Sequence, residues 1–261
     1  MKIIVCIKQV PDTTEVKLDP KTGRLIRDGV PSIINPDDKN ALEEALRIKD
    51  EHEGTTVTVV SMGPPQADVA MREALAMGAD EAILISGREF GGSDTWATSY
   101  IIATALKKIG DFDIILCGRQ AIDGDTAQVG PQIAEQLGIP QITYVQKLTI
   151  DGNKVICERA LEDGYTVVEA NMPVLLTAIK ELNTPRYMTP KGIYDAYKQT
   201  VRVWGFKDVP VDEAKIGLKG SPTNVNKTFS PAPKGQGEML EGADKNTVKT
   251  LVDKLVEKHL L

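Results

Sequence analysis

The segment 118–130 holds residue types that could bind a phosphate group. Gly118 ends an apolar strand-like run, where a ligand could approach the backbone closely, and DGDT follows at 123–126. A helix predicted over 125–137 would then carry small residues in its first turns, leaving amide hydrogens open to an anion that the helix dipole favours. The alternative to phosphate binding is that an aspartate or threonine of this segment is an ordinary N-cap of the helix. The absence of GxGxxG argues against a conventional NAD fingerprint.

Two further loops have the same character. NPDD at 35–38 lies between a strand-like run and a helix, and MGP at 62–64 follows another apolar run. Ligands of open α/β sheets collect beyond the carboxyl ends of strands. We therefore expect these three loops to converge on one cleft.

Side-chain catalysis has little support in the sequence. His52 and His259 are the only histidines, and each lies in a polar helix end typical of a solvated face. The motifs HExxH, GxSxG and GxxxxGK[ST] do not occur, and we assign no catalytic residue and no metal ligand. If this protein transfers electrons or groups, a bound cofactor must supply the chemistry.

The elements that would position these loops alternate along the first half of the chain. Strands are predicted over 3–10, 56–62, 82–86 and 113–118, and helices over 38–51, 65–77, 94–108 and 125–137. This alternation predicts an α/β fold with a mostly parallel sheet and helices on both faces. A polar hairpin is predicted over 17–28.

The pattern changes after Pro140. Runs at 142–150, 155–161, 166–170 and 174–179 are predicted as antiparallel strands, because Asp-Gly pairs at 151–152 and 163–164 favour hairpin turns. We expect them to extend the parallel sheet. Residues 1–214 would then form the nucleotide-binding α/β domain.

The last part of the chain, 215–261, is predicted to be an extended arm ending in a helix. Residues 215–242 are rich in Gly, Pro, Ser, Asn and Lys and show no apolar period. The helix predicted over 244–260 has one apolar stripe, which could dock on its own domain or on another subunit.

Composition limits the class of protein. The 261 residues carry a formal net charge of −6 without a basic run, which argues against nucleic acid. Cys6, Cys117 and Cys157 are far apart in apolar runs, which indicates buried free thiols in a reducing compartment. No apolar stretch is long enough to cross a bilayer, and MKIIVCIKQV is a better first strand than a signal peptide. We expect a cytoplasmic protein.

The chain resembles the beta subunit of electron-transfer flavoproteins. The resemblance rests on the order and combination of motifs over roughly the first 190 residues: KQVPD at 8–12, NPDD at 35–38, EEALRIK at 43–49, VSMGP at 60–64, REALAMGAD at 72–80, GRQAIDGDTAQVGPQIAEQLG at 118–138, PVLLT at 173–177 and ELNTPRYMTP at 181–190.

The resemblance implies a heterodimer with a larger alpha subunit that carries FAD. The beta subunit would hold AMP in conventional members and a second FAD in electron-bifurcating ones. Residues 184–192, with Arg186 and Tyr187, would dock acyl-CoA dehydrogenase partners, and the arm would wrap the alpha subunit. Nucleotide contacts, mostly through the backbone, are implied at Cys6, Asn35, Pro36, Asp37, Asp38, Met62, Gly118, Arg119, Gln120, Ala121, Ile122, Asp123, Gly124, Asp125, Thr126, Ala127, Gln128 and Val129.

Departures from the conventional pattern favour the bifurcating type. Ala127 stands where conventional AMP-binding members often carry Asn, and GSDT at 92–95 resembles the anaerobic, bifurcating type. Thr95 would open a helix that meets the additional pyrophosphate of FAD, with a simple N-cap as the alternative. Such a heterodimer would move electrons from NADH to an acyl-CoA dehydrogenase and to ferredoxin or flavodoxin. The alternatives are a conventional AMP-holding subunit and a nucleotide-sensing α/β module.

Overall fold

A computed structural model describes residues 1–12, 31–227, 235 and 237–261. The hairpin predicted over 17–28 lies outside the described residues. The chain divides into two units, Met1–Val225 and Asn226–Leu261.

The first unit is built on a nine-stranded sheet with the order β11-β5-β4-β1-β6-β10-β7-β8-β9. Every neighbouring pair from β11 to β7 is parallel, whereas β7, β8 and β9 pair antiparallel. The mostly parallel sheet and the added antiparallel strands are thus confirmed. The strands are β1 Lys2–Cys6, β4 Thr56–Met62, β5 Glu81–Ile85, β6 Ile114–Gly118, β7 Gln141–Asp151, β8 Lys154–Leu161, β9 Gly164–Asn171, β10 Val174–Ala178 and β11 Arg202–Trp204.

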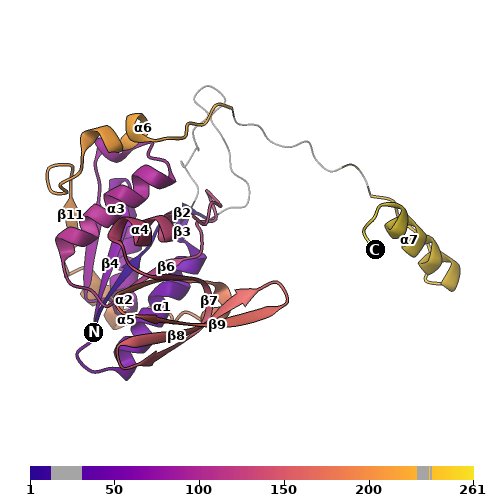
Figure 1. Ribbon diagram of the computed structural model, residues 1–261, viewed down its shortest axis with the longest axis horizontal. Coiled ribbons are helices and arrows are strands. Elements are labelled where there is room, and N and C mark those ends of the chain that lie inside the picture. The colour runs from indigo at the N-terminus through magenta and orange to yellow at the C-terminus, as the bar shows by residue number, and fades with distance from the viewer. Residues whose placement is uncertain (13–30, 228–234, 236) are drawn as a thin grey trace. The chain divides into compact units, whose positions relative to one another are not determined.

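Helices cover both faces of the parallel part (Figure 1). The helices α1 Pro36–Glu51 and α2 Asp68–Met77 pack with α5 Pro190–Ala196 on one face, through residues such as Leu42 and Met71. On the other face lie α3 Thr95–Ile109 and α4 Val129–Leu137, with Ile101 and Ile133 in the core. Because both faces are buried, the central strands β1, β6 and β10 are rich in Val, Ile and Leu.

The strand predicted over 174–179 is not antiparallel. β10 lies between β6 and β7 and runs parallel to both. All five of its residues are buried, which suits a central strand, whereas β9 is largely exposed and forms the edge. The continuous apolar run VLLTA was the signal that separates β10 from its alternating neighbours.

The strand predicted over 3–10 is also divided in the structure. β1 ends at Cys6, and the chain pairs again as β2 Gln9–Pro11 with β3 Ser32–Ile34 in a separate two-stranded antiparallel sheet. Short helical elements lie at η1 Pro65–Ala67, η2 Arg88–Phe90, η3 Lys180–Leu182, η4 Glu213–Lys215 and α6 Gly217–Gly220.

The second unit contains the predicted terminal helix, α7 Lys245–Glu257. The carboxylate of Asp244 caps it by accepting hydrogen bonds from the amides of Asn246 and Thr247. Its apolar residues Val248, Leu251 and Val256 are about half exposed within the described chain, at 55%, 47% and 51%. No helix among the described residues is long and apolar enough to cross a membrane.

Candidate functional site

Neighbouring strands bring the predicted loops to one edge of the sheet. β4, β1 and β6 are adjacent, and they end at Met62, Cys6 and Gly118. In register, Cys6 lies beside Val60 on one side and Cys117 on the other. Met62 lines a small cleft together with Lys8. The loops after Met62 and Gly118 therefore lie at the carboxyl ends of parallel strands that flank β1, as ligand sites of such sheets do. The 35–38 loop differs, because it follows β3 of the separate antiparallel sheet and opens α1.

Asn35 and Lys8 hold the 118–130 loop in place. The Asn35 side chain is fully buried; its Nδ2 donates to the Gln120 carbonyl at 2.8 Å, and its Oδ1 accepts from the Ile122 amide at 3.0 Å. The Lys8 ammonium pairs with Asp123 at 2.6 Å. Asn35 thus holds the loop in position through its side chain, and the nucleotide contact implied for this residue stays a prediction.

The space above Gly118 belongs to helix α1. A Cβ atom built on Gly118 would lie 2.3 Å from Asp38 Oδ1 and 2.7 Å from the Asp37 carbonyl carbon. The Gly118 amide donates to Asp38 Oδ1 at 2.9 Å. The start of α1 therefore occupies the place that a side chain at 118 would need, and this packing alone explains the glycine. A nucleotide contact at its backbone stays a prediction.

Asp38 is a buried carboxyl that joins two strand ends. Its Oδ2 accepts from the Lys8 amide at 2.7 Å, and its Oδ1 from Gly118. Burial raises the pKa of Asp38 to about 7, because the hydrogen bonds from the Lys8 and Gly118 amides offset only part of the desolvation cost.

This raised pKa predicts a pH dependence of stability. The folded chain holds a proton on Asp38 more tightly than the unfolded chain does. Protonated Asp38 therefore contributes to folding stability, fully below the unfolded pKa, and this contribution is lost as the pH rises through the folded pKa of about 7. Between about pH 5 and 8 we expect the wild-type free energy of unfolding to fall by about 1–3 kcal/mol relative to Asp38→Asn. Urea denaturation at several pH values measures this, and parallel curves for the two proteins would contradict it.

Helix α4 begins later than the sequence predicted. Gln128 is the N-cap residue and Val129 is the first helical residue, whereas the pattern placed the start at Asp125. Asp125 and Ala127 have φ values of 53° and 52°, in the left-handed region that a right-handed helix excludes. Gln120 donates a hydrogen bond to Asp125 across this turn.

The turn presents a group of unused amide hydrogens. Among contacts to the described residues, the amides of Thr126, Ala127, Gln128, Val129 and Gly130 donate no hydrogen bond. Thr126 and Gln128 are exposed. Left-handed turns and helix starts of this kind form anion-binding concavities.

Helix α3 starts beside this turn. The hydroxyl of Thr95, its first residue, donates to Gln128 Oε1 at 3.2 Å. The preceding residue, Asp94, caps α3 by accepting from the Ala97 amide at 3.0 Å. The N-cap expected near 93–95 is confirmed, and the structure also joins the GSDT stretch to the 118–130 loop.

Arg119 points to the other side of the loop. Its Nε lies 3.3 Å from Asp37 Oδ2, although without the angle of a hydrogen bond, and its guanidinium lies 5.9 Å from the centre of the Tyr144 ring. Burial raises the pKa of Asp37, against the effect of Arg119. The remaining predicted residues differ in exposure: Pro36, Ile122 and Gly124 face outward, whereas Cys6, Met62, Ala121 and Val129 are half-buried.

Sequence reasoning missed Lys8 and Tyr144 as parts of this site. Lys8 lay in the KQVPD motif, two residues after Cys6, and its position at a strand end was the usable signal. Tyr144 has a φ of 57°, which nothing in its residue type indicates, and its amide donates to the Thr177 hydroxyl at 3.1 Å.

Comparison with known proteins identifies the family of this chain. A model of the electron transfer flavoprotein domain matches residues 22–209. The chain is 59% identical over 261 residues to an electron transfer flavoprotein subunit beta of Clostridium acetobutylicum, covering 100% of both chains. The chain belongs to the electron transfer flavoprotein beta-subunit family.

Other relatives are named for the complexes in which they work. The chain is 58% identical over 262 residues to the caffeyl-CoA reductase-Etf complex subunit CarD of Acetobacterium woodii. It is 53% identical over 269 residues to the acryloyl-CoA reductase electron transfer subunit gamma of Anaerotignum propionicum. Both matches cover 100% of this chain and of the relative.

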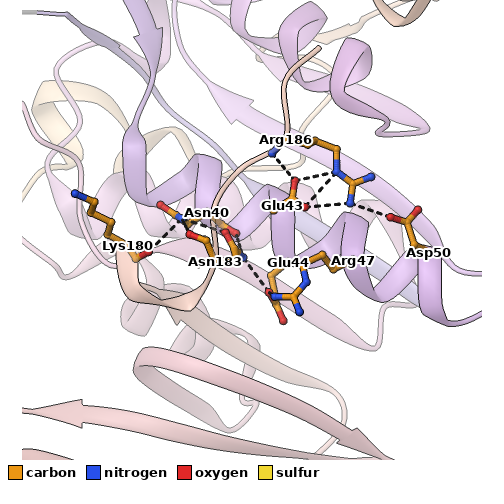
Figure 2. A network of polar contacts seen from close by, with 8 residues as sticks. All are labelled: Asn40, Glu43, Glu44, Arg47, Asp50, Lys180, Asn183 and Arg186. Carbon is orange, nitrogen blue, oxygen red and sulfur yellow. Dashed lines mark hydrogen bonds and ion pairs between the residues drawn. The ribbon is translucent and has the colours of Figure 1, made fainter. Parts of the chain in front are cut away.

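A second polar network in this electron transfer flavoprotein subunit fixes the segment before α5 (Figure 2). Arg186 forms a two-pronged ion pair with Glu43 of α1, with Nε at 2.9 Å from Oε2 and Nη2 at 3.1 Å from Oε1, and it also reaches Asp50 at 2.8 Å. Asn183 donates to Glu44 at 2.9 Å. The network leaves the next residue, Tyr187, 95% exposed.

Proposed function

We propose that this chain binds an adenine nucleotide at the 118–130 loop and works with an electron transfer flavoprotein alpha subunit. The observation that carries the proposal is the group of amides at 126–130, beside the left-handed turn, that donate no hydrogen bond to any residue the structure describes. These amides, with the start of α4, suit a pyrophosphate or phosphate group. Asn35, Asp38 and Lys8 set the position of the loop from beneath.

FAD is the cofactor that we propose for this site. The Thr95–Gln128 contact brings a second helix start, that of α3, to the same loop, which would serve the longer pyrophosphate of FAD better than the single phosphate of AMP. Bound FAD would supply hydride and electron chemistry that the side chains of this chain lack. The residues Cys6, Met62 and Pro36 would line its approach, and the backbone of 118–129 would orient it.

We further propose flavin-based electron bifurcation as the function of the heterodimer. Electrons would pass from NADH to an acyl-CoA dehydrogenase and to ferredoxin or flavodoxin, in the cytoplasm. The names of relatives with caffeyl-CoA reductase and acryloyl-CoA reductase support a dehydrogenase partner that acts on enoyl-CoA compounds. Residues 184–192 would dock that partner, and residues 215–261 would contact the alpha subunit.

A cofactor inventory tests the proposal. The chain is purified with its alpha subunit, and FAD and AMP are released and counted separately. We expect two FAD per heterodimer. One FAD with one AMP would support a conventional subunit in place of a bifurcating one. Nucleotide without flavin, and without an alpha partner, would support a nucleotide-sensing module.

A further inference from the structure

Residues 217–223 fold back onto the loop that precedes α3. The buried Ser221 hydroxyl accepts from the Asp94 amide at 2.9 Å and donates to the Gly217 carbonyl at 2.7 Å. The Gly217 amide donates to the Ser93 hydroxyl at 3.0 Å. Both ends of the 217–221 turn are therefore fastened to the same short stretch, GSDT.

The backbone at Gly217 shows that this contact is close. Its φ is 61°, and a Cβ atom there would lie 2.5 Å from the Glu89 carbonyl oxygen. A residue with a side chain could not take this position without moving the chain. The 217–223 segment therefore packs directly on the backbone before α3.

The two carboxylate oxygens of Asp94 accept hydrogen bonds from different elements, one from α3 and the other from the 217–223 segment. Oδ1 caps the helix through the Ala97 amide, and Oδ2 accepts both the Thr223 amide at 2.9 Å and the Thr223 hydroxyl at 2.8 Å. Although burial acts in the opposite direction, these hydrogen bonds hold the pKa of Asp94 below its usual value. The group is therefore a charged acceptor at neutral pH, whose hydrogen bonds are the stronger kind.

The adjacent residue connects this cluster to the proposed nucleotide loop. Thr95 donates to Gln128, which immediately precedes α4. Displacing Asp94 would rotate the first turn of α3 and move the Thr95 hydroxyl, so the Gln128 side chain would lose its partner. A short chain of contacts thus runs from Thr223 through Asp94 and Thr95 to Gln128.

We propose that Asp94 is a positioning residue that couples nucleotide binding at the 118–130 loop to the attachment of Thr223. The proposal rests on the nucleotide function proposed above. Coupling is reciprocal. A nucleotide bound at the loop strengthens the hydrogen bonds between Thr223 and Asp94, and these hydrogen bonds in turn raise the affinity for the nucleotide. The first unit ends at Val225, just beyond Thr223, so the coupling acts where the chain passes into residues 226–261.

The first test compares nucleotide affinity among variants at Thr223. Thr223→Val removes the hydroxyl donor while keeping size, and Thr223→Ser retains it. Titration of the full chain with AMP and with FAD should show affinity weakened by about fivefold or more for Thr223→Val and restored in Thr223→Ser. Thr200→Val is the matched control, since Thr200 is exposed and no hydrogen bond joins its side chain to a residue that the structure describes.

The second test measures the reverse direction. Added nucleotide should slow hydrogen exchange of the Thr223 amide by about fivefold in the wild type, and this response should vanish in Asp94→Ser. Serine can still cap α3 but is too short to reach Thr223 as well. The coupling would be overturned if the wild type and Thr223→Val bound nucleotide with equal affinity, or if nucleotide left the hydrogen exchange of the Thr223 amide unchanged. Either result would leave the nucleotide function standing. A wild-type chain that binds neither AMP nor FAD would overturn the nucleotide function and the coupling with it.

Discussion

Gly118→Ala is expected to destabilise the first unit by about 3 kcal/mol or more, or to prevent folding. The added methyl would meet Asp38 Oδ1 at 2.3 Å and the Asp38 amide nitrogen at 2.6 Å. These atoms belong to the start of α1 and have no room to yield without moving that helix from the ends of β1 and β6. The Gly118–Asp38 hydrogen bond would also be lost, leaving a buried carboxyl with one partner fewer.

Gly124→Ala is the matched control for this prediction. Gly124 lies in the same loop, but a Cβ atom there meets nothing within 4 Å, and its φ is outside the left-handed region. Alanine should therefore leave stability unchanged or raise it by about 0.5 kcal/mol. Denaturant titration of both variants decides the matter. Gly118→Ala with the stability of Gly124→Ala would show that α1 does not depend on this contact.

The parallel part of the fold was readable from the sequence because its signals are local. Runs such as IILC at 114–117 are apolar throughout, and helices such as α3 begin with a capping residue, Asp94, and end at Gly110. The place of β10 in the sheet depended on pairing with β6, a partner far away in sequence. Local turn signals at 151–152 and 163–164 gave the β7–β9 hairpins, and β10 was wrongly grouped with them.

The candidate site was predictable in its location but not in its internal contacts. Strand ends placed the loops that contain Cys6, Met62 and Gly118 at one edge. The predicted start of α4 was wrong because Asp125 and Ala127 adopt left-handed backbone. Gln120 contacts Asp125, and Asn35 holds residues 120 and 122 of the same loop, and neither contact has a periodic signal in the sequence. Side chains that bridge distant segments, as Asp94 and Thr223 do, leave no periodic trace in a sequence.

Arg186→Ala should also have a large effect, because it leaves the buried Glu43 carboxylate without its main partner. Glu43 is 5% exposed and accepts from the Arg186 amide and guanidinium. Breaking a buried pair costs about 3–5 kcal/mol, but one third of the Arg186 side chain is exposed to water. We therefore expect a loss of about 2–3 kcal/mol in the free energy of unfolding.

Arg47→Ala provides the comparison on the same helix. Arg47 is about half exposed, and its one ion pair with a described residue joins it to Glu44 at 3.3 Å, so its removal should cost less than about 1 kcal/mol. Denaturant titration compares the two variants. Equal losses would show that Glu43 finds other partners when Arg186 is absent.

The same pair of variants separates stability from the proposed docking of a dehydrogenase. Arg186 anchors the chain immediately before Tyr187, whose 95% exposure makes it the most prominent apolar side chain of residues 184–192. Freed from Glu43, this segment would have to be ordered when a partner binds, at a cost in conformational entropy. With Arg186→Ala, the acyl-CoA dehydrogenase concentration that gives the half-maximal rate of electron transfer from the heterodimer should therefore rise about tenfold. The flavin content of the heterodimer should stay unchanged. An unchanged requirement would show that the Glu43–Arg186 pair serves stability alone, whereas lost flavin would show that it supports the nucleotide loop through α1.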